Sequence, residues 1–302
     1  MGKTYTVEKD YQNTRFDKWF KAKIINLPQS LIEKIIRLNK VKINRKRVKS
    51  SYRVKCGDIV EVYDISKFKE NYRPKIIKYK PSKKEINIYD DFIIENNENF
   101  IIINKPAGIA VQSGTKSFKN IIDILKDSKY FVNHKPYIVH RLDKETSGIL
   151  IVAKSREYAQ LFTSLFRIRK IHKTYVALTY GKVSKLKTIL KDDLVLYENN
   201  RKIIQKAISY LKVLKSSDSY SYVELNPITG RKHQLRKQLY NIGNPIVGDN
   251  KYFINRKLNK KKSKNNNLML HAYKIKFMIN NVQYNFKAKY NKDFEDFFKR
   301  EF

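Results

Sequence analysis

One charged loop holds the side chains with the clearest chemical potential. Residues 140–146 include two carboxylates and two cations. Apolar residues precede this loop at 138–139 and follow it at 149–153, and such short runs are typical of strands buried on both faces. A polar loop fixed between two buried strands can hold one side chain in place, as a catalytic carboxylate requires. Asp143 is a candidate for such a group, although on the pattern alone an ordinary ion pair with Arg141 or Lys144 on a solvated turn is the more common role of such an aspartate.

The charge of the chain points to a polyanionic partner. Its 302 residues include 65 Lys and Arg against 28 Asp and Glu, a net charge of +37. Nucleic acid is the natural partner of such an excess, although part of it reflects the general preference of this sequence for Lys, Asn and Ile. A membrane surface is the alternative, but no long amphipathic basic helix stands out. With 41% hydrophobic residues, the chain is long enough to form two domains.

Cysteine and histidine usage argues against disulfide and metal sites. The single cysteine, Cys56, excludes an internal disulfide and a multi-cysteine zinc site, and we expect it to pack as a small apolar residue. The five histidines show no metal-ligand spacing, and we expect His271 to be structural. The N-terminus has no apolar signal core, and no run approaches transmembrane length. We therefore expect a cytoplasmic protein that does not contact membranes.

Residues 14–63 have the pattern of a small basic module. Aromatic and aliphatic residues at spacings of three and four follow Thr14, which can cap a first helix, and Pro28 opens a second. Short strands are expected at 41–43 and 59–62. Cations around these strands can contact a phosphate backbone, although an ordinary solvated basic face is the alternative. The candidate RNA-binding residues are Arg37, Lys40, Arg45, Lys46 and Arg47.

Further apolar runs predict the elements of a second, larger domain. Strands are expected at 92–94, 100–103, 173–178 and 220–225, followed by a last strand pair after residue 272. Ser155 can cap a helix, and we make no assignment for residues 182–207. Two highly charged segments separate these elements. One carries a weak strand at 76–77, and the other, at 254–267, is expected to be a mobile loop that touches RNA phosphates.

Several segments of the larger domain resemble the motifs of the pseudouridine synthases of the RluA type. His140–Asp143, followed by Ser147–Leu150, is similar to the motif that carries the essential aspartate of that family. The other matching segments are Asn104–Gly108, Lys173–Tyr175, Gly230–Arg236 and Gly243–Asp249, in the order of the family. The resemblance covers nearly the whole chain.

The N-terminal module resembles an S4 RNA-binding domain. The resemblance rests on Arg15–Asp17, Leu27–Ser30, Val41–Asn44 and Gly57–Asp58. The glycine usual in that family before the first strand is replaced by Asn39 or Lys40, and asparagine tolerates the left-handed conformation that such a turn requires. An S4 domain followed by a catalytic domain is the order of RluC-like and RluD-like members.

These resemblances imply a two-domain α+β protein. We expect an S4 domain at residues 14–76, a linker at 77–88 and a catalytic domain at 89–302, built on a mixed, mostly antiparallel sheet with flanking helices. The implied activity is that of an isomerase that converts uridine in RNA to pseudouridine. The reaction breaks the bond from uracil N1 to ribose C1′ and joins C5 to the same carbon without exchange of electrons. No redox cofactor, nucleotide or metal is therefore expected.

The resemblance also assigns roles to individual side chains. Asp143 attacks the sugar carbon, attacks the base or removes a sugar proton, and the sequence leaves these three roles open. Arg236 provides the guanidinium that keeps this carboxylate ionised, with Arg231 as second choice and a phosphate contact as its alternative. Tyr175 stacks on the detached uracil, unless it is a core tyrosine. Arg141 fills the space left by the flipped uridine, unless it pairs with Asp143.

The expected substrate is large-subunit (23S) ribosomal RNA, as for RluC-like members, and the enzyme is expected to be a monomer. A synthase that modifies transfer RNA is the alternative within the class. Two alternatives from other classes are a non-catalytic S4-type RNA-binding or ribosome-assembly factor and a nucleoside hydrolase. A pure binder has no need of the combined Asp143, Tyr175 and Arg236 set, and a hydrolase releases free uracil.

Overall fold

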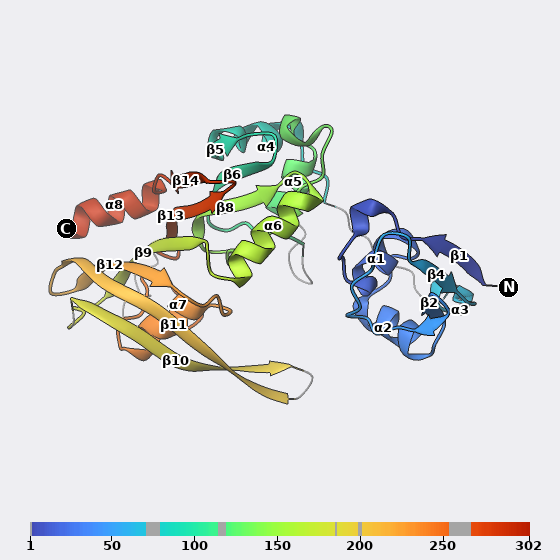
Figure 1. The fold of residues 1–302 in the computed structure, drawn as a ribbon. Coiled ribbons are helices and arrows are strands. Elements are labelled where there is room, and N and C mark those ends of the chain that lie inside the picture. Colours follow the sequence, from blue (N-terminus) through green and yellow to red (C-terminus); the bar gives the residue numbers. More distant parts are fainter. Residues whose placement is uncertain (1, 71–78, 114–118, 185, 199–200, 254–266) are drawn as a thin grey trace. The chain divides into compact units, whose positions relative to one another are not determined.

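The computed structural model describes residues 2–70, 79–113, 119–184, 186–198, 201–253 and 267–302 (Figure 1). The chain divides into two compact units, Met1–Ile77 and Lys78–Phe302, each with its own β-sheet. The strand expected at 76–77 and nearly all of the loop expected at 254–267 lie outside the described residues. Within the described part, no helix is both long and apolar enough to cross a membrane.

The smaller unit combines a four-stranded antiparallel sheet with two main helices. The sheet order is β1-β4-β2-β3. Its elements are β1 (Lys3–Thr6), η1 (Lys9–Tyr11), α1 (Phe16–Lys23), α2 (Gln29–Arg37), β2 (Val41–Ile43), β3 (Lys46–Arg47), β4 (Ile59–Val62) and α3 (Ser66–Glu70). Both predicted helices and both predicted strands are confirmed. Phe16, Trp19 and Phe20 are buried together with Ile32 and Ile35 of α2, which explains their helical spacing.

Local contacts explain where the smaller unit departs from the expectation. Strand β1 lies before the expected domain start at residue 14 and pairs with β4. Arg15, and not Thr14, is the N-cap of α1, because the Thr14 carbonyl accepts the N–H of Val54 at 2.9 Å. The expectation that Cys56 packs as an apolar residue is wrong, since it is exposed in the turn before β4. Asn39 has a φ of 55°, which confirms the predicted left-handed turn.

The larger unit is built on a ten-stranded sheet. The strand order is β10-β11-β12-β9-β13-β8-β6-β5, with β14 beside β13 and β7 beside β8. The strands are β5 (Ile93–Asn96), β6 (Phe100–Lys105), β7 (Tyr137–Ile138), β8 (Ser147–Ala153), β9 (His172–Tyr180), β10 (Lys187–Glu198), β11 (Arg201–Ser216), β12 (Tyr220–Pro227), β13 (Leu270–Ile279) and β14 (Val282–Lys287). Strands β8 and β13 pair in parallel and the other described pairs are antiparallel, which confirms the α+β class with a mixed, mostly antiparallel sheet.

Helices accompany this sheet, some at places that the sequence did not reveal. They are α4 (Lys83–Ile88), η2 (Asp90–Phe92), α5 (Ile121–Lys126), η3 (Lys129–Phe131), α6 (Arg156–Arg167), α7 (Gln234–Asn241) and α8 (Lys292–Glu301). Helix α6 confirms the predicted cap, because the Ser155 hydroxyl accepts the N–H of Tyr158 at 3.2 Å. Helix α4 occupies the second half of the expected linker and begins with a capping box of Ser82 and Glu85. The expected linker is therefore partly helical.

Alternate residues of β6 face two apolar layers. Ile101 and Ile103 pack in a cluster that includes Ile124 of α5, whereas Phe100 and Ile102 pack with Phe162 of α6. The period of two agrees with a strand buried on both faces. The sheet between these layers is the rigid support of the loop at 140–146.

One glycine brings that loop to the centre of the sheet. Gly148 at the start of β8 lies opposite Ala272 of β13 in the parallel pairing. Its φ is 107°, and a Cβ at this position would lie 2.3 Å from the Ala272 carbonyl oxygen. Only glycine permits this close approach. The loop between β7 and β8 is therefore held beside β13, and β13 in turn pairs with β9.

Candidate active site

Asp143 lies on a turn that is anchored from two sides. The Asp143 carbonyl accepts the N–H of Thr146 at 3.1 Å, and the Lys144 carbonyl accepts the N–H of Gly108 at 2.9 Å. The ammonium group of Lys105 donates to the same Lys144 carbonyl at 3.2 Å. The segment around Lys105, one of the motifs noted in the sequence, therefore supports the loop that carries the carboxylate.

Lys105 is a buried cation that links two loops. Its ammonium also donates to the carbonyls of Pro106 (2.8 Å) and Ile109 (2.9 Å), so that each of its N–H donors has an acceptor. Burial lowers the pKa of Lys105 to about 7, against the opposing influence of Glu145 and Asp143. The side chain therefore serves as a structural cross-link that is only partly charged at neutral pH.

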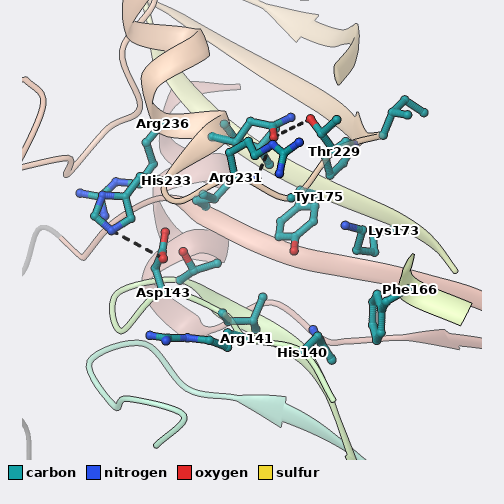
Figure 2. Close-up of a pocket in the computed structure, with 18 of the residues that line it drawn as sticks. His140, Arg141, Asp143, Phe166, Lys173, Tyr175, Thr229, Arg231, His233 and Arg236 are labelled. Carbon is teal, nitrogen blue, oxygen red and sulfur yellow. Dashed lines mark hydrogen bonds and ion pairs between the residues drawn. The ribbon is translucent and has the colours of Figure 1, made fainter. Parts of the chain in front are cut away.

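The residues predicted for the catalytic site come together around two cavities, and Figure 2 shows one of them. The cavities measure about 570 and about 950 Å³. Asp143, Arg141, Arg231 and Arg236 line both, and Tyr175 lines the smaller one. The sequence therefore identified residues that the fold collects at one place, at the junction of the two cavities.

His233 is the nearest polar side chain that the structure places beside the Asp143 carboxylate. Its Nε2 lies 3.6 Å from Oδ1 of Asp143, and 32% of the aspartate side chain is exposed (Figure 2). Burial lowers the pKa of His233, and the charge of Asp143 opposes this shift while Arg236 and Lys251 add to it. The ring is therefore largely neutral at pH 7. Sequence reasoning missed His233, although it lies inside the quoted Gly230–Arg236 segment as the only non-cationic titratable group there.

Arg236 does not pair with Asp143, which corrects the sequence expectation. Its guanidinium donates from Nε to Oδ2 of Asp249 at 2.8 Å and from Nη2 to Oδ1 at 2.6 Å, and both side chains are buried. Burial alone would lower the pKa of Arg236, but the hydrogen bonds and charge of Asp249, with a smaller contribution from Asp143, raise it. A buried bidentate pair satisfies the guanidinium so well that Asp143 acts on it only from a distance.

Tyr175 and Lys173 point into the smaller cavity from β9, opposite the loop with Asp143 (Figure 2). Their separation by two residues places both side chains on one face of the strand. Burial raises the pKa of Tyr175, and the charge of Asp143 adds to this, so the phenol stays protonated. Burial lowers the pKa of Lys173, and no carboxylate of the described residues forms an ion pair with it.

An aromatic wall closes the other end of the smaller cavity. The ring of His140 packs on Phe166 of α6, with centroids 4.8 Å apart and planes tilted by 33°. Nε2 of His140 accepts the N–H of Ile151 at 2.8 Å. Burial lowers the pKa of His140 to about 3, and Lys173 adds to this shift. The ring is therefore neutral and fixed, which suits a structural role in the wall.

The two remaining arginines lie at the rim. Arg141 is exposed and makes no ion pair with Asp143 among the described contacts, so the simple ion-pair interpretation of Asp143 does not apply. Arg231 is exposed and donates from Nε to the Lys206 carbonyl of β11 at 3.2 Å. Both guanidinium groups remain open to solvent and able to meet a phosphate.

His271 lies apart from the cavities and has the structural role that the sequence suggested. It is 1% exposed, and its Nδ1 lies 2.9 Å from the Ser147 hydroxyl. Burial lowers the pKa of His271 to about 4. Among the residues that the structure describes, no group of three or more His, Cys, Asp or Glu side chains is placed to hold a metal ion.

The basic residues of the smaller unit gather around the β2–β3 hairpin. Arg37 and Arg47 border a hollow of about 500 Å³, together with Lys49. Arg45, Lys46 and Arg47 are exposed, and Lys40 is half-buried. These side chains can reach an anionic surface, with Lys40 the least available.

Comparison with known proteins places this geometry in a family. Residues 99–241 match the model of the RNA pseudouridylate synthase family. A ribosomal large subunit pseudouridine synthase C from Rickettsia felis is 36% identical over 259 residues, which cover 80% of this chain and 82% of that protein. Another, from Buchnera aphidicola subsp. Schizaphis graminum, is 34% identical over 294 residues, or 90% of this chain and 88% of that protein.

A solved structure supports the same conclusion. Human RNA pseudouridylate synthase domain containing 4 superposes with a TM-score of 0.61 and 27% identity, covering 71% of this chain and 94% of that one. The chain therefore belongs to the RNA pseudouridylate synthase family. It is an RNA pseudouridine synthase, an isomerase, of the RluC-like group within the RluA type.

Proposed function

We propose that this enzyme isomerises specific uridines of large-subunit (23S) ribosomal RNA and that Asp143 is its catalytic residue. The observation that carries the site assignment is the position of this carboxylate, which is partly shielded on an anchored turn at the junction of two cavities. The substrate assignment is supported by relatives named for the large ribosomal subunit that match most of the chain. Transfer RNA remains the alternative substrate.

The reaction requires an ionised carboxylate beside the sugar. The bond from N1 to C1′ breaks, the base turns, C5 bonds to C1′, C5 loses its proton and N1 gains one. Asp143 attacks C1′, attacks the base or removes a sugar proton, and the site is compatible with each of these roles. The ring of His233 lies beside this carboxylate, and the charge of Asp143 contributes at longer range to the raised pKa of Arg236.

The smaller cavity is suited to hold the uracil ring. Its volume of about 570 Å³ is within the range of about 300–1,000 Å³ of small-molecule sites. Tyr175 offers a flat protonated phenol for stacking, and the His140–Phe166 wall limits the space. Lys173 supplies a donor for a carbonyl oxygen of the base, which becomes more negative as the N1–C1′ bond breaks.

The larger cavity and its rim are suited to the flanking nucleotides. Lys232 and Lys251 line it together with Arg231 and Arg141, and these cations can meet phosphates on either side of the reacting uridine. The uridine must leave its stack to reach Asp143, and Arg141 is placed to fill the vacated space.

The smaller unit is proposed to be an S4 RNA-binding domain. The exposed cations Arg37, Arg45, Lys46 and Arg47, with the half-buried Lys40, would contact RNA phosphates and help to offset the cost of flipping the uridine. The proposed catalytic domain is residues 89–302, preceded by the S4 domain at 14–76 and a linker at 77–88. We also propose that the enzyme acts in the cytoplasm as a monomer and needs no cofactor.

Sequencing that maps pseudouridine in ribosomal and transfer RNA tests the substrate. RNA from cells that carry the gene is compared with RNA from a deletion strain and from a strain complemented with Asp143→Ala. The proposal expects sites in large-subunit RNA that disappear in the deletion and are not restored by the variant. Sites that disappear only from transfer RNA would overturn the substrate assignment.

A further inference from the structure

Three polar side chains form a row that ends at Asp143. The hydroxyl of Tyr252 lies 2.6 Å from Nδ1 of His233, and Nε2 of the same ring lies 3.6 Å from Oδ1 of Asp143. The rings of His233 and Tyr252 meet edge to face, with centroids 5.6 Å apart and planes at 78°. The two nitrogens of one imidazole therefore face a phenol on one side and a carboxylate on the other.

The direction of these hydrogen bonds follows from the protonation of the groups. A neutral imidazole carries one N–H, and burial lowers the pKa of His233 while the cations Arg236, Lys251 and Lys232 oppose a charged ring. Burial raises the pKa of Tyr252, so its hydroxyl keeps the proton and can donate to Nδ1. The hydrogen of the ring is then on Nε2 and points to Asp143. The reverse tautomer would turn the Nε2 lone pair towards an anionic carboxylate.

Tyr252 is held by the ion pair between Arg236 and Asp249, which the structure shows in place of the expected pairing of Arg236 with Asp143. Its N–H donates to Oδ1 of Asp249 at 3.1 Å, and its ring lies 5.2 Å from the guanidinium carbon of Arg236. The buried Arg236–Asp249 pair therefore fixes the position of Tyr252, and through it the row of Tyr252, His233 and Asp143.

His233 adopts an unusual backbone conformation for this contact. It is the N-cap of α7 with a φ of 54°, in the left-handed region, where the surrounding structure must offset the strain. The side chain of Gln234 locks the turn, because its Oε1 accepts the hydroxyl of Thr229 at 2.7 Å and the N–H of Arg231 at 3.0 Å. The turn thus fixes the ring opposite the carboxylate.

We propose that His233 is a positioning residue for Asp143 and that Tyr252 sets its tautomer, so that the Nε2–H of a neutral imidazole is directed to one oxygen of the carboxylate. The other oxygen is then presented to the reacting nucleotide. At 3.6 Å the contact is longer than a hydrogen bond, and we expect it to shorten when RNA fills the cavities. This inference rests on the proposed catalytic role of Asp143.

The kinetic test compares three variants under single-turnover conditions with an RNA fragment that contains the target uridine. His233→Leu removes the donor, and a hydrogen bond to a charged group corresponds to a rate loss of about 10- to 100-fold. His233→Gln keeps an N–H near the same place and should recover most of the rate. Tyr252→Phe should lose about tenfold. RNA affinity should be unchanged, and Tyr240→Phe, an exposed tyrosine of α7, is the matched control.

The second measurement reads the tautomer itself and does not depend on activity. Two-bond ¹H–¹⁵N correlation spectra of the full-length protein distinguish a ring protonated at Nε2 from one protonated at Nδ1. With five histidines in the chain, each can be assigned by substitution. We expect His233 to be protonated at Nε2 in the wild type and to show a mixture of tautomers in Tyr252→Phe. An unchanged tautomer in that variant, or an equal rate loss in His233→Gln and His233→Leu, overturns the inference.

Asp143→Ala separates this inference from the function on which it rests. If that variant keeps forming pseudouridine, the proposed catalytic role fails and the positioning role fails with it. If that variant is inactive while His233→Leu reacts at the wild-type rate, the catalytic role stands and only the positioning role is refuted.

Discussion

The buried Arg236–Asp249 pair allows a quantitative test of the fold around the site. Asp249→Asn keeps the shape of the side chain but removes its charge. Two hydrogen bonds of 2.6 and 2.8 Å join the partners, whose side chains are 7% and 1% exposed. Leaving one partner of a buried pair uncompensated costs about 3–5 kcal/mol. Because asparagine still accepts one hydrogen bond, we expect the larger unit to lose about 3 kcal/mol of unfolding free energy at pH 7.

The loss should depend on pH with a defined sign. Burial would raise the pKa of Asp249, but hydrogen bonds from Arg236 and the backbone of Tyr252 and Lys251 lower it below its ordinary value of 3.8. A carboxyl group with a lowered pKa contributes stability above its unfolded value and loses it as the pH falls through the folded value. The difference between the wild type and Asp249→Asn should therefore be full at neutral pH and shrink below pH 3.8.

Urea unfolding provides the assay and an internal control. Trp19 is the only tryptophan and lies in α1 of the smaller unit, so its fluorescence reports that unit. Circular dichroism follows the ten-stranded sheet of the larger unit. Asp249→Asn should lower the urea midpoint of the larger unit, followed by circular dichroism, and leave the midpoint of the smaller unit, followed by Trp19 fluorescence, unchanged. Equal stability at pH 7, or a loss that persists undiminished under acid conditions, would refute the reasoning.

Three further perturbations test other parts of the site. Gly148→Ala should cost more than about 3 kcal/mol of unfolding free energy in thermal unfolding, because its Cβ would lie 2.3 Å from the Ala272 carbonyl oxygen. The control Gly243→Ala, at a φ of 82° with no atom near the added Cβ, should cost only about 1 kcal/mol. Similar losses in the two variants would contradict the close approach at Gly148. Burial lowers the pKa of Lys105 from 10.5 to about 7, so the unfolded state binds more protons than the folded state between these pH values. The unfolding free energy of the larger unit should therefore rise between pH 7 and pH 9, by at most about 1.4 kcal/mol per pH unit. Lys105→Met should abolish this rise, and a variant with the pH dependence of the wild type would contradict the lowered pKa. Tyr175→Phe should keep most of the rate of pseudouridine formation, because the aromatic ring remains and the phenol it replaces is neutral, its pKa being raised by burial. Tyr175→Leu should lose about tenfold or more in the same single-turnover assay, because the ring is lost. Equal losses in the two variants would exclude stacking as the main role of Tyr175.

The elements with a regular apolar period could be predicted from the sequence. Helix α6 begins after Ser155 as expected, and β6 coincides with the apolar run that starts at Phe100. The ribbon of β10 and β11 could not be assigned, because its solvent face also carries apolar residues. Ile204 is 60% exposed and Leu214 is 41% exposed, so the alternation that marks a half-buried strand is lost.

The members of the site could be predicted better than their contacts. The motif resemblance predicted that Asp143, Tyr175, Arg231 and Arg236 belong to one site, and in the structure all four line the same cavity. It could not determine which of two nearby carboxylates takes the guanidinium of Arg236, since this depends on burial and side-chain geometry. For the same reason His233, a single histidine among cations, had no sequence signal to distinguish it from a surface residue.

The most direct test of the account is the activity of Asp143→Asn. This substitution keeps the size of the side chain and its place on the anchored turn but removes the negative charge. We predict that the variant binds the RNA fragment with wild-type affinity and forms no pseudouridine in a single-turnover assay monitored by mass spectrometry after chemical labelling. Formation of pseudouridine at a rate close to that of the wild type would contradict the central claim.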